Sequence, residues 1–330
     1  MKLPGTIILS RPDNLGDAVL TLPMAGAIKK RSPGTRIIAL VKRYTEPLWR
    51  QCTHVDGIIA LEDLQAAGMN APDQLKKLGA DAIVHVFPQR EVAHWAKQAG
   101  IPLRIGTSHR LWHWGTCNKR VHFSRKNSDL HEAQLNFELL APFGMHVPEL
   151  QKLSPLMGFH LPEADVAMRH LLRPDKINVI LHPLKVTGAA WGLPNFGELM
   201  RSMDPARYHV LLTGTKAEAE VYRKALPVEL PHITDTGGTL SLEQLMGLIG
   251  KVDALVAAST GPLHIAAAAG IRTIGLFNMR RPLHPGRWAP LGPDAHVLVQ
   301  DPHCPQCKRG QPCDCITRIP VARVLELLPE

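Results

Sequence analysis

The chain has 330 residues, which is too long for one ordinary hydrophobic core and fits two domains of about 150 residues each. Its apolar content of 45% is normal for a globular protein, and no segment reaches the roughly 18 uncharged apolar residues that a membrane span needs. A formal net charge of +9 favours acidic partners, namely nucleic acid, anionic lipid or a phosphorylated sugar.

The first predicted element is an apolar strand at residues 6–10, followed by a loop at 11–17 and a helix at 18–30. Apolar residues recur along that helix at helical spacing, and Pro23 falls in its first turns, where proline is tolerated. The start of a helix favours an ionised carboxylate by about 0.3–1 kcal/mol at exposed sites, which suits Asp17 as a base. From its position alone, however, capping explains Asp17 better than catalysis does.

Further strands and helices alternate along both halves of the chain, as expected for parallel sheets covered on both faces. The segment Gly144 to Pro162 has three prolines and little periodicity, so it is the expected connection between two domains at 1–155 and 156–330. The remaining predicted strands are 36–41, 57–61, 82–86, 178–181, 209–213, 254–258 and 273–277.

Between residues 90 and 126 the chain is strongly basic, and only Glu91 opposes the positive charges. Histidines and aromatic residues are interleaved, with Trp112 and Trp114 among turn-like residues. Such a segment is most often a solvated surface, although basic residues mixed with aromatic ones also suit nucleic acid. The basic residues are Arg90, Lys97, Arg104, Arg110, Lys119, Arg120, Arg125 and Lys126.

A second strand, turn and helix lies at residues 254–270, where the turn Ser259-Thr260-Gly261 leads into an alanine-rich helix that carries His264. Unpaired amides at a helix N-terminus, together with the helix dipole, favour a bound anion. Taken alone, the turn is equally consistent with a phosphate site and with ordinary capping.

Several strings of the chain together resemble the family 9 glycosyltransferases, the bacterial heptosyltransferases of lipopolysaccharide core assembly and their relatives. The likeness runs from about residue 5 to about residue 327, with the strings in the right order. The strings are N-L-G-D-A-V-L-T-L-P (14–23), H-E-A-Q-L-N-F-E-L-L (131–140), L-H-P (181–183), W-G-L-P-N-F (191–196), L-L-T-G-T-K-A-E (211–218) and S-T-G-P-L-H-I-A-A-A (259–268).

The resemblance implies the GT-B architecture, in which two Rossmann-like α/β domains with parallel sheets face each other across a cleft. The first domain would bind the acceptor and the second the nucleotide sugar, with the final helix at about 319–328 packing back on the first domain. The implied reaction is inverting, metal-independent transfer of a heptose-like sugar from a nucleotide diphosphate, with ADP-heptose as the leading donor, to a lipopolysaccharide core precursor.

The resemblance also implies partners and a location. The acceptor would be an acidic, phosphorylated, lipid-linked saccharide, and no nucleic acid is expected. Because Met1 leads straight into a strand without a secretory signal, we expect a cytoplasmic protein that touches the inner face of the cytoplasmic membrane transiently.

The resemblance assigns roles to residues in both halves of the chain. Asp17 would be the catalytic base, with Asp13 in the same loop as the fallback. Contacts to the donor would come from Lys185, Thr187, Gly188, Glu218, Ser259, Thr260, Gly261 and His264, with Glu218 at the ribose or, alternatively, in a surface ion pair. Contacts to the acceptor would come from Arg11, Asn14, Arg90, Arg110, Lys119, Arg120, Arg125 and Lys126.

The chain departs from the family pattern at two places. Many heptosyltransferases have a lysine just before the tryptophan matched by Trp191, where this chain has Ala189 and Ala190, and many have an aspartate at the position of Ser259. Another nucleotide sugar therefore remains an alternative donor. A sugar-nucleotide epimerase and a non-catalytic sugar- or nucleotide-binding paralogue remain alternative functions.

The six cysteines fall into two groups. Cys52 and Cys117 are isolated and are expected to be free thiols. Cys304, Cys307, Cys313 and Cys315 share a loop rich in proline and glycine, and four thiols that close are able to bind a structural zinc ion. One residue separates the second pair, where two to four are usual, so neutral or redox-labile cysteines are the preferred interpretation, and no metal or other cofactor is expected to be required.

Overall fold

The computed structural model describes residues 3–125, 128–184 and 189–330 of the chain. It divides into two compact units, residues 1–160 and 161–330. The boundary falls between His160 and Leu161, slightly later than the sequence predicted. In the described parts of the chain, no helix is both long enough and apolar enough to cross a membrane.

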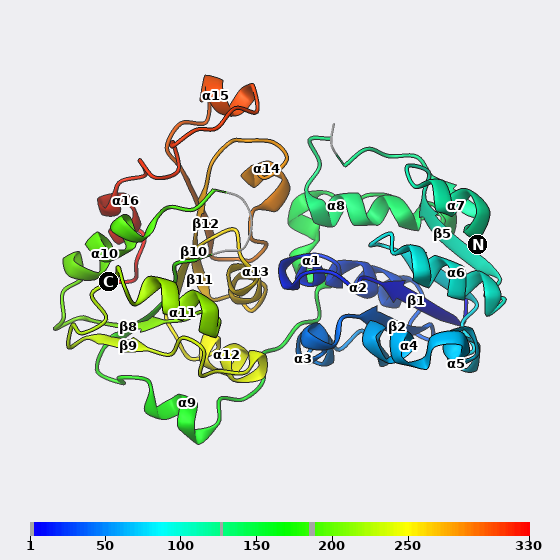
Figure 1. The fold of residues 1–330 in the computed structure, drawn as a ribbon, viewed down its shortest axis with the longest axis horizontal. Helices are drawn as coiled ribbons and strands as arrows, with labels where there is room; N and C mark the ends of the chain where they lie inside the picture. The colour runs from blue at the N-terminus through cyan, green and yellow to red at the C-terminus, as the bar shows by residue number, and fades with distance from the viewer. Residues whose placement is uncertain (1–2, 126–127, 185–188) are drawn as a thin grey trace. The chain divides into compact units, whose positions relative to one another are not determined.

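The first unit is built on a six-stranded parallel sheet with the strand order β3-β2-β1-β4-β5-β6 (Figure 1). The central strand β1 is covered on both faces, and Ile7, Ile8 and Leu9 are 0% exposed. Ile7 pairs with Ile37 of β2 on one side and with Ala82 of β4 on the other. The strands are β1 (Thr6–Ser10), β2 (Arg36–Val41), β3 (Gly57–Ala60), β4 (Ala82–His85), β5 (Leu103–Thr107) and β6 (Lys119–Val121).

Helices connect these strands, and two of them differ from the sequence prediction. The single helix expected at 18–30 is two helices, because Pro23 lacks an N–H and stands in the first turn of the second one. Trp112 and Trp114 lie in a helix, not in a turn. The helices are α1 (Leu15–Val19), α2 (Leu22–Arg31), α3 (Glu46–Arg50), α4 (Leu61–Ala67), α5 (Ala71–Lys77), α6 (Arg90–Gln98), α7 (Leu111–Thr116) and α8 (Glu132–Phe137), with 3-10 turns η1 (Arg43–Thr45), η2 (Gly68–Asn70), η3 (Glu138–Phe143), η4 (Leu150–Lys152) and η5 (Ser154–Leu156).

The second unit repeats the plan with the order β12-β11-β10-β7-β8-β9, again all parallel. Its strands are β7 (Ile177–His182), β8 (Tyr208–Leu212), β9 (Ile233–Asp235), β10 (Ala254–Ala258), β11 (Arg272–Phe277) and β12 (Ala295–Val299). Its helices are α9 (Val166–His170), α10 (Leu193–Ser202), α11 (Lys216–Tyr222), α12 (Leu242–Ile249), α13 (Gly261–Ala268), α14 (Pro285–Trp288), α15 (Pro305–Lys308) and α16 (Val321–Leu325).

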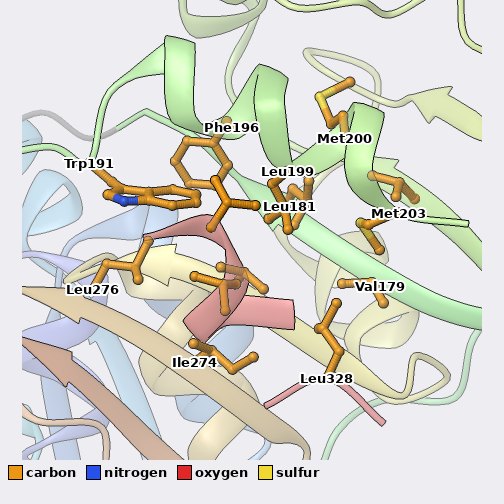
Figure 2. Close-up of a cluster of buried hydrophobic side chains, with 14 of the residues drawn as sticks. Val179, Leu181, Trp191, Phe196, Leu199, Met200, Met203, Ile274, Leu276 and Leu328 are labelled. Carbon is orange, nitrogen blue, oxygen red and sulfur yellow. The ribbon is translucent and has the colours of Figure 1, made fainter. Parts of the chain in front are cut away.

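The core of the second unit includes Trp191 (Figure 2), whose ring meets Phe196 edge-on at 5.0 Å between centroids. The indole Nε1 donates a hydrogen bond of 2.9 Å to the carbonyl of Ile319, which brings the C-terminal segment into the core. Val324 of α16 and Leu328 are buried in the same cluster. The buried face of the final helix is therefore used within the second unit, whereas the sequence analysis expected it to pack on the first domain.

Candidate functional site

Each unit carries part of its candidate residues where its strand order reverses, between β1 and β4 in the first unit and between β7 and β10 in the second. In parallel α/β sheets, ligands bind outside the carboxyl ends of the strands at this reversal. The loop at 11–14 follows β1 directly, and the turn at 259–260 follows β10. Both of the predicted strand–loop–helix units therefore lie at a reversal point.

Asp17 lies on the short helix α1 and keeps 15% of its side chain exposed. Its Oδ1 accepts a hydrogen bond from Nη2 of Arg11, the residue that follows β1. Asn14 stands at the N-cap of α1 without making a side-chain capping bond. Asp17 is thus a mostly buried, ion-paired carboxylate with a small opening to solvent.

Arg11 is shared among three carboxylates, since its Nη2 is also 3.4 Å from Oε1 of Glu132 and 3.6 Å from Oδ2 of Asp13. The arginine is only 3% exposed. It was predicted to contact the acceptor, and the structure instead uses its guanidinium inside the protein, where it holds Asp17. A second arginine, Arg125, pairs with Glu132 in the same network.

Glu132 and Asn136 are buried residues of α8. Neither was assigned a role from the sequence. Asn136 accepts from Nη2 of Arg125 at 3.0 Å, and its Nδ2 donates to the carbonyl of Leu20 at 3.1 Å. Glu132 is 2% exposed. The signal available in the sequence was the string at 131–140, whose glutamate and asparagine stand among apolar residues that a helix buries.

The pKa of Asp17 is raised from 3.8 to about 6, chiefly by burial and also by the nearby charges of Asp13 and Glu132, which together outweigh the lowering effect of Arg11. The sequence analysis expected the helix start to favour the ionised form of Asp17. The net pKa is nevertheless raised, because α1 has only five residues and burial outweighs its dipole. The carboxylate still ionises below neutral pH.

The basic segment carries exposed guanidinium groups above aromatic rings. The guanidinium of Arg120 lies 4.6 Å from the ring centroid of Trp114, and that of Arg110 lies 5.7 Å from that of Trp112. An open pocket of about 610 Å³ lies beside them, lined by Pro88, Gln89, Arg90, Glu91, His94 and Trp112. Lys119 is exposed on β6, and Lys126 lies outside the described residues.

In the second unit, the N-terminus of α13 has features of an anion site. Thr260 is its N-cap residue but makes no side-chain capping bond, and its buried Oγ1 has no hydrogen-bond partner among the described residues. Gly261 begins the helix, half-buried Ser259 precedes it, and His264 is 2% exposed within it. Backbone amides of the first turn and a hydroxyl thus converge at the end of β10.

Glu218 lies at the start of α11, directly beyond the end of β8, and is held by a capping box. Its Oε2 accepts from the amide of Thr215 at 2.7 Å and from the hydroxyl of Thr215 at 2.9 Å. His182 at the end of β7 lies near this carboxylate, and burial lowers its pKa. The predicted donor residues Lys185, Thr187 and Gly188 lie outside the described residues.

Comparison with known proteins gives both a family and a fold. The profile described as glycosyltransferase family 9 (heptosyltransferase) matches residues 72–317. Lipopolysaccharide heptosyltransferase 3 of Escherichia coli is 23% identical over 284 residues, covering 79% of this chain and 80% of that protein.

Two solved structures share the fold along nearly the whole chain. A glycosyl transferase family 9 protein of Veillonella parvula gives a TM-score of 0.82 at 16% identity and covers 99% of this chain and 97% of that one. The ADP-heptose lipopolysaccharide heptosyltransferase II of Escherichia coli gives a TM-score of 0.75 at 18% identity, with coverage of 98% and 97%. With its two six-stranded parallel sheets, the fold is GT-B, as the sequence predicted.

Proposed function

The chain belongs to glycosyltransferase family 9, whose members are glycosyltransferases of the heptosyltransferase type, and from this premise we propose the specific reaction. A heptose-like sugar moves from ADP to a phosphorylated saccharide of the lipopolysaccharide core. One observation carries the proposal. A part-buried carboxylate, Asp17, stands at the strand reversal of one unit, and an uncapped helix N-terminus stands at that of the other.

In the proposed mechanism, Asp17 is the base. With a pKa of about 6, its carboxylate is ionised at neutral pH yet basic enough to take the proton of an acceptor hydroxyl. The hydroxyl oxygen then bonds to the anomeric carbon while the bond from that carbon to the diphosphate breaks. The proton ends on Asp17, and the leaving ADP carries away the negative charge.

The diphosphate is proposed to bind at the N-terminus of α13, where amides and the Thr260 hydroxyl offer donors. Glu218, fixed by Thr215, is proposed to accept from the ribose hydroxyls. The acceptor phosphates are proposed to bind the exposed guanidinium groups of Arg110 and Arg120, which lie over the rings of Trp112 and Trp114. The alanines before Trp191 and the serine at 259 leave other nucleotide sugars as the alternative donor.

Replacing Asp17 by asparagine tests the proposed base. Asp17→Asn keeps the size of the side chain but cannot accept the proton, so we expect turnover with ADP-heptose to fall by about 10²–10⁴-fold. The affinity for ADP, measured by calorimetry, should stay within threefold of the wild-type value. A threefold change corresponds to about 0.7 kcal/mol of binding free energy. Turnover is measured as ADP release that depends on the acceptor.

The matched control is Asp13→Asn, which removes a carboxylate from the same loop and leaves Asp17 in place. It should retain turnover at neutral pH. Unchanged turnover in Asp17→Asn refutes the assignment, and loss of turnover in Asp13→Asn alone transfers the role to Asp13.

A further inference from the structure

Four cysteines that the transfer reaction does not use gather in the segment between β12 and α16. They are Cys304, Cys307, Cys313 and Cys315, called here the thiol cluster, and their sulfur atoms all lie within 4.8 Å of one another. The Sγ of Cys313 is 3.5 Å from the sulfurs of both Cys304 and Cys307, and the Sγ of Cys307 is 3.4 Å from that of Cys315.

These distances match a tetrahedron around one ion. A metal bound at about 2.3 Å by four thiolates holds their sulfurs about 3.8 Å apart. Two disulfides would instead divide the sulfurs into two pairs, whereas Cys313 is equally close to two different partners. We propose that the thiol cluster binds a single tetrahedrally coordinated metal ion, either zinc or mononuclear iron, the ions that an all-thiolate tetrahedron selects.

The surroundings of the cluster support a built site. Cys304, Cys307 and Cys315 are at most 3% exposed, and they form a small cluster of their own with Cys313 and the half-buried Met279. The amide of Cys315 lies 3.2 Å from the Sγ of Cys313, so it donates to a sulfur that would carry negative charge. The single residue between these two cysteines, which counted against a metal in the sequence, is therefore no obstacle.

The ion would serve as a structural staple. Figure 1 shows α15 on an excursion of the chain that leaves the sheet after β12 and returns at α16. Among the described residues, the apolar cluster found in this segment consists of the thiol cluster with Met279 packed against it, which is little apolar surface to order the segment. Directly beyond Cys315, Ile316 and Ile319 enter the main core beside Trp191. Binding releases the thiol protons to solvent and fixes the path of the chain into that core.

Metal analysis of the untagged, full-length protein tests the proposal. Cells are grown with added zinc and iron, the protein is purified without chelator, and both metals are measured by plasma mass spectrometry. We expect zinc and iron together to reach about one equivalent per chain, and native mass spectrometry to show one ion lost on acidification. The double variant Cys307→Ser/Cys315→Ser should lose the metal.

The matched control is Cys52→Ser/Cys117→Ser, which removes two buried thiols far along the chain from the cluster and should keep the full metal content. If the cluster variant fails to fold, wild-type protein decides the question through its metal content and its free thiols. Less than about 0.2 equivalents of both metals in wild-type protein overturns the proposal. Disulfides among residues 304–315 in the freshly purified protein overturn it as well.

Discussion

At the scale of single residues, the candidate site is governed by one buried arginine. Burial, together with the charges of Asp13 and Glu132, outweighs the ion pair with Arg11, so Asp17 keeps a pKa of about 6. A carboxylate with the usual pKa near 4 would be a weaker base for a hydroxyl proton. The buried network therefore positions Asp17 and also tunes it.

We expect the acid limb of the pH profile to report this tuning. Below pH 6, kcat/KM should fall about tenfold per pH unit, because protonated Asp17 cannot act as a base. In Asp13→Asn the limb should move to lower pH, since the charge of Asp13 raises the pKa of Asp17. Initial rates from pH 4.5 to 8 measure both effects. A limb that stays in place, or moves upward, contradicts the coupling.

The raised pKa of Asp17 affects stability and activity in opposite directions as the pH falls. The folded-state pKa of Asp17 lies above the ordinary value of 3.8, so the folded protein binds this proton more tightly than the unfolded chain does. Between about pH 6 and pH 4, protonation of Asp17 therefore stabilises the fold while it removes the base. Protonation of Asp17 therefore does not cause unfolding between about pH 6 and pH 4, and unfolding at this residue does not explain a loss of activity there.

The sequence identified Asp17 but not the network around it. Asp17 could be found because a strand, a loop and a helix start are local patterns and the string at 14–23 is specific. Its environment could not be found, because Arg11 meets Glu132 across 121 residues of chain. Only the packing of α8 against α2 decides that contact, so the burial of Asp17 and its raised pKa could not be predicted from the local sequence.

At the scale of elements, the innermost strands of both sheets and the edge strand β3 could be predicted, whereas β5 and the other three edge strands could not. β1 and β10 have the predicted bounds because they are buried on both faces and read as continuous apolar runs. β6 is an edge strand in which Lys119 and Arg120 are exposed, so its apolar signal is lost. β5, β9 and β12 were missed as well, and β9 and β12 are also at edges.

The contact between α2 and η5 offers a test of element packing. Gly26 of α2 approaches the backbone of η5 so closely that an added Cβ would lie 1.9 Å from the carbonyl oxygen of Leu156. Backbone atoms cannot step aside as a flexible side chain can, so Gly26→Ala should destabilise the first unit by about 1–3 kcal/mol. Thermal unfolding followed by circular dichroism measures the loss.

Gly34→Ala is the matched control for this change. An added Cβ there meets nothing within 4 Å, so its melting temperature should stay close to that of the wild type. Equal stability of the two variants would show that α2 and η5 are not packed as described.

At the scale of the whole molecule, two units of the same topology each enclose a core of their own. The sequence predicted this division and its approximate boundary, because the prolines at 148, 155 and 162 interrupt the periodic pattern. It did not predict that α16 completes the second core. Helix docking at that scale depends on which apolar surface is left uncovered, and local periodicity does not report it.

We expect residues 161–330 to fold alone and to bind ADP more tightly than UDP, GDP or CMP, since the proposed diphosphate site lies wholly within that unit. A fragment that ends at residue 318 should fail to fold, because it lacks Val324 and Leu328 of the core. Circular dichroism and calorimetry measure folding and binding. A folded 161–330 fragment without any nucleotide preference contradicts the proposed donor site.

The late arrival of the C-terminal segment matters while the protein is being made. Trp191 emerges from the ribosome 128 residues before Ile319, whose carbonyl its indole needs. At about 5–20 residues per second, the nascent second unit waits about 6–25 s before the C-terminal segment completes the core around Trp191. During that interval the incompletely covered apolar surface of the growing chain is prone to aggregation.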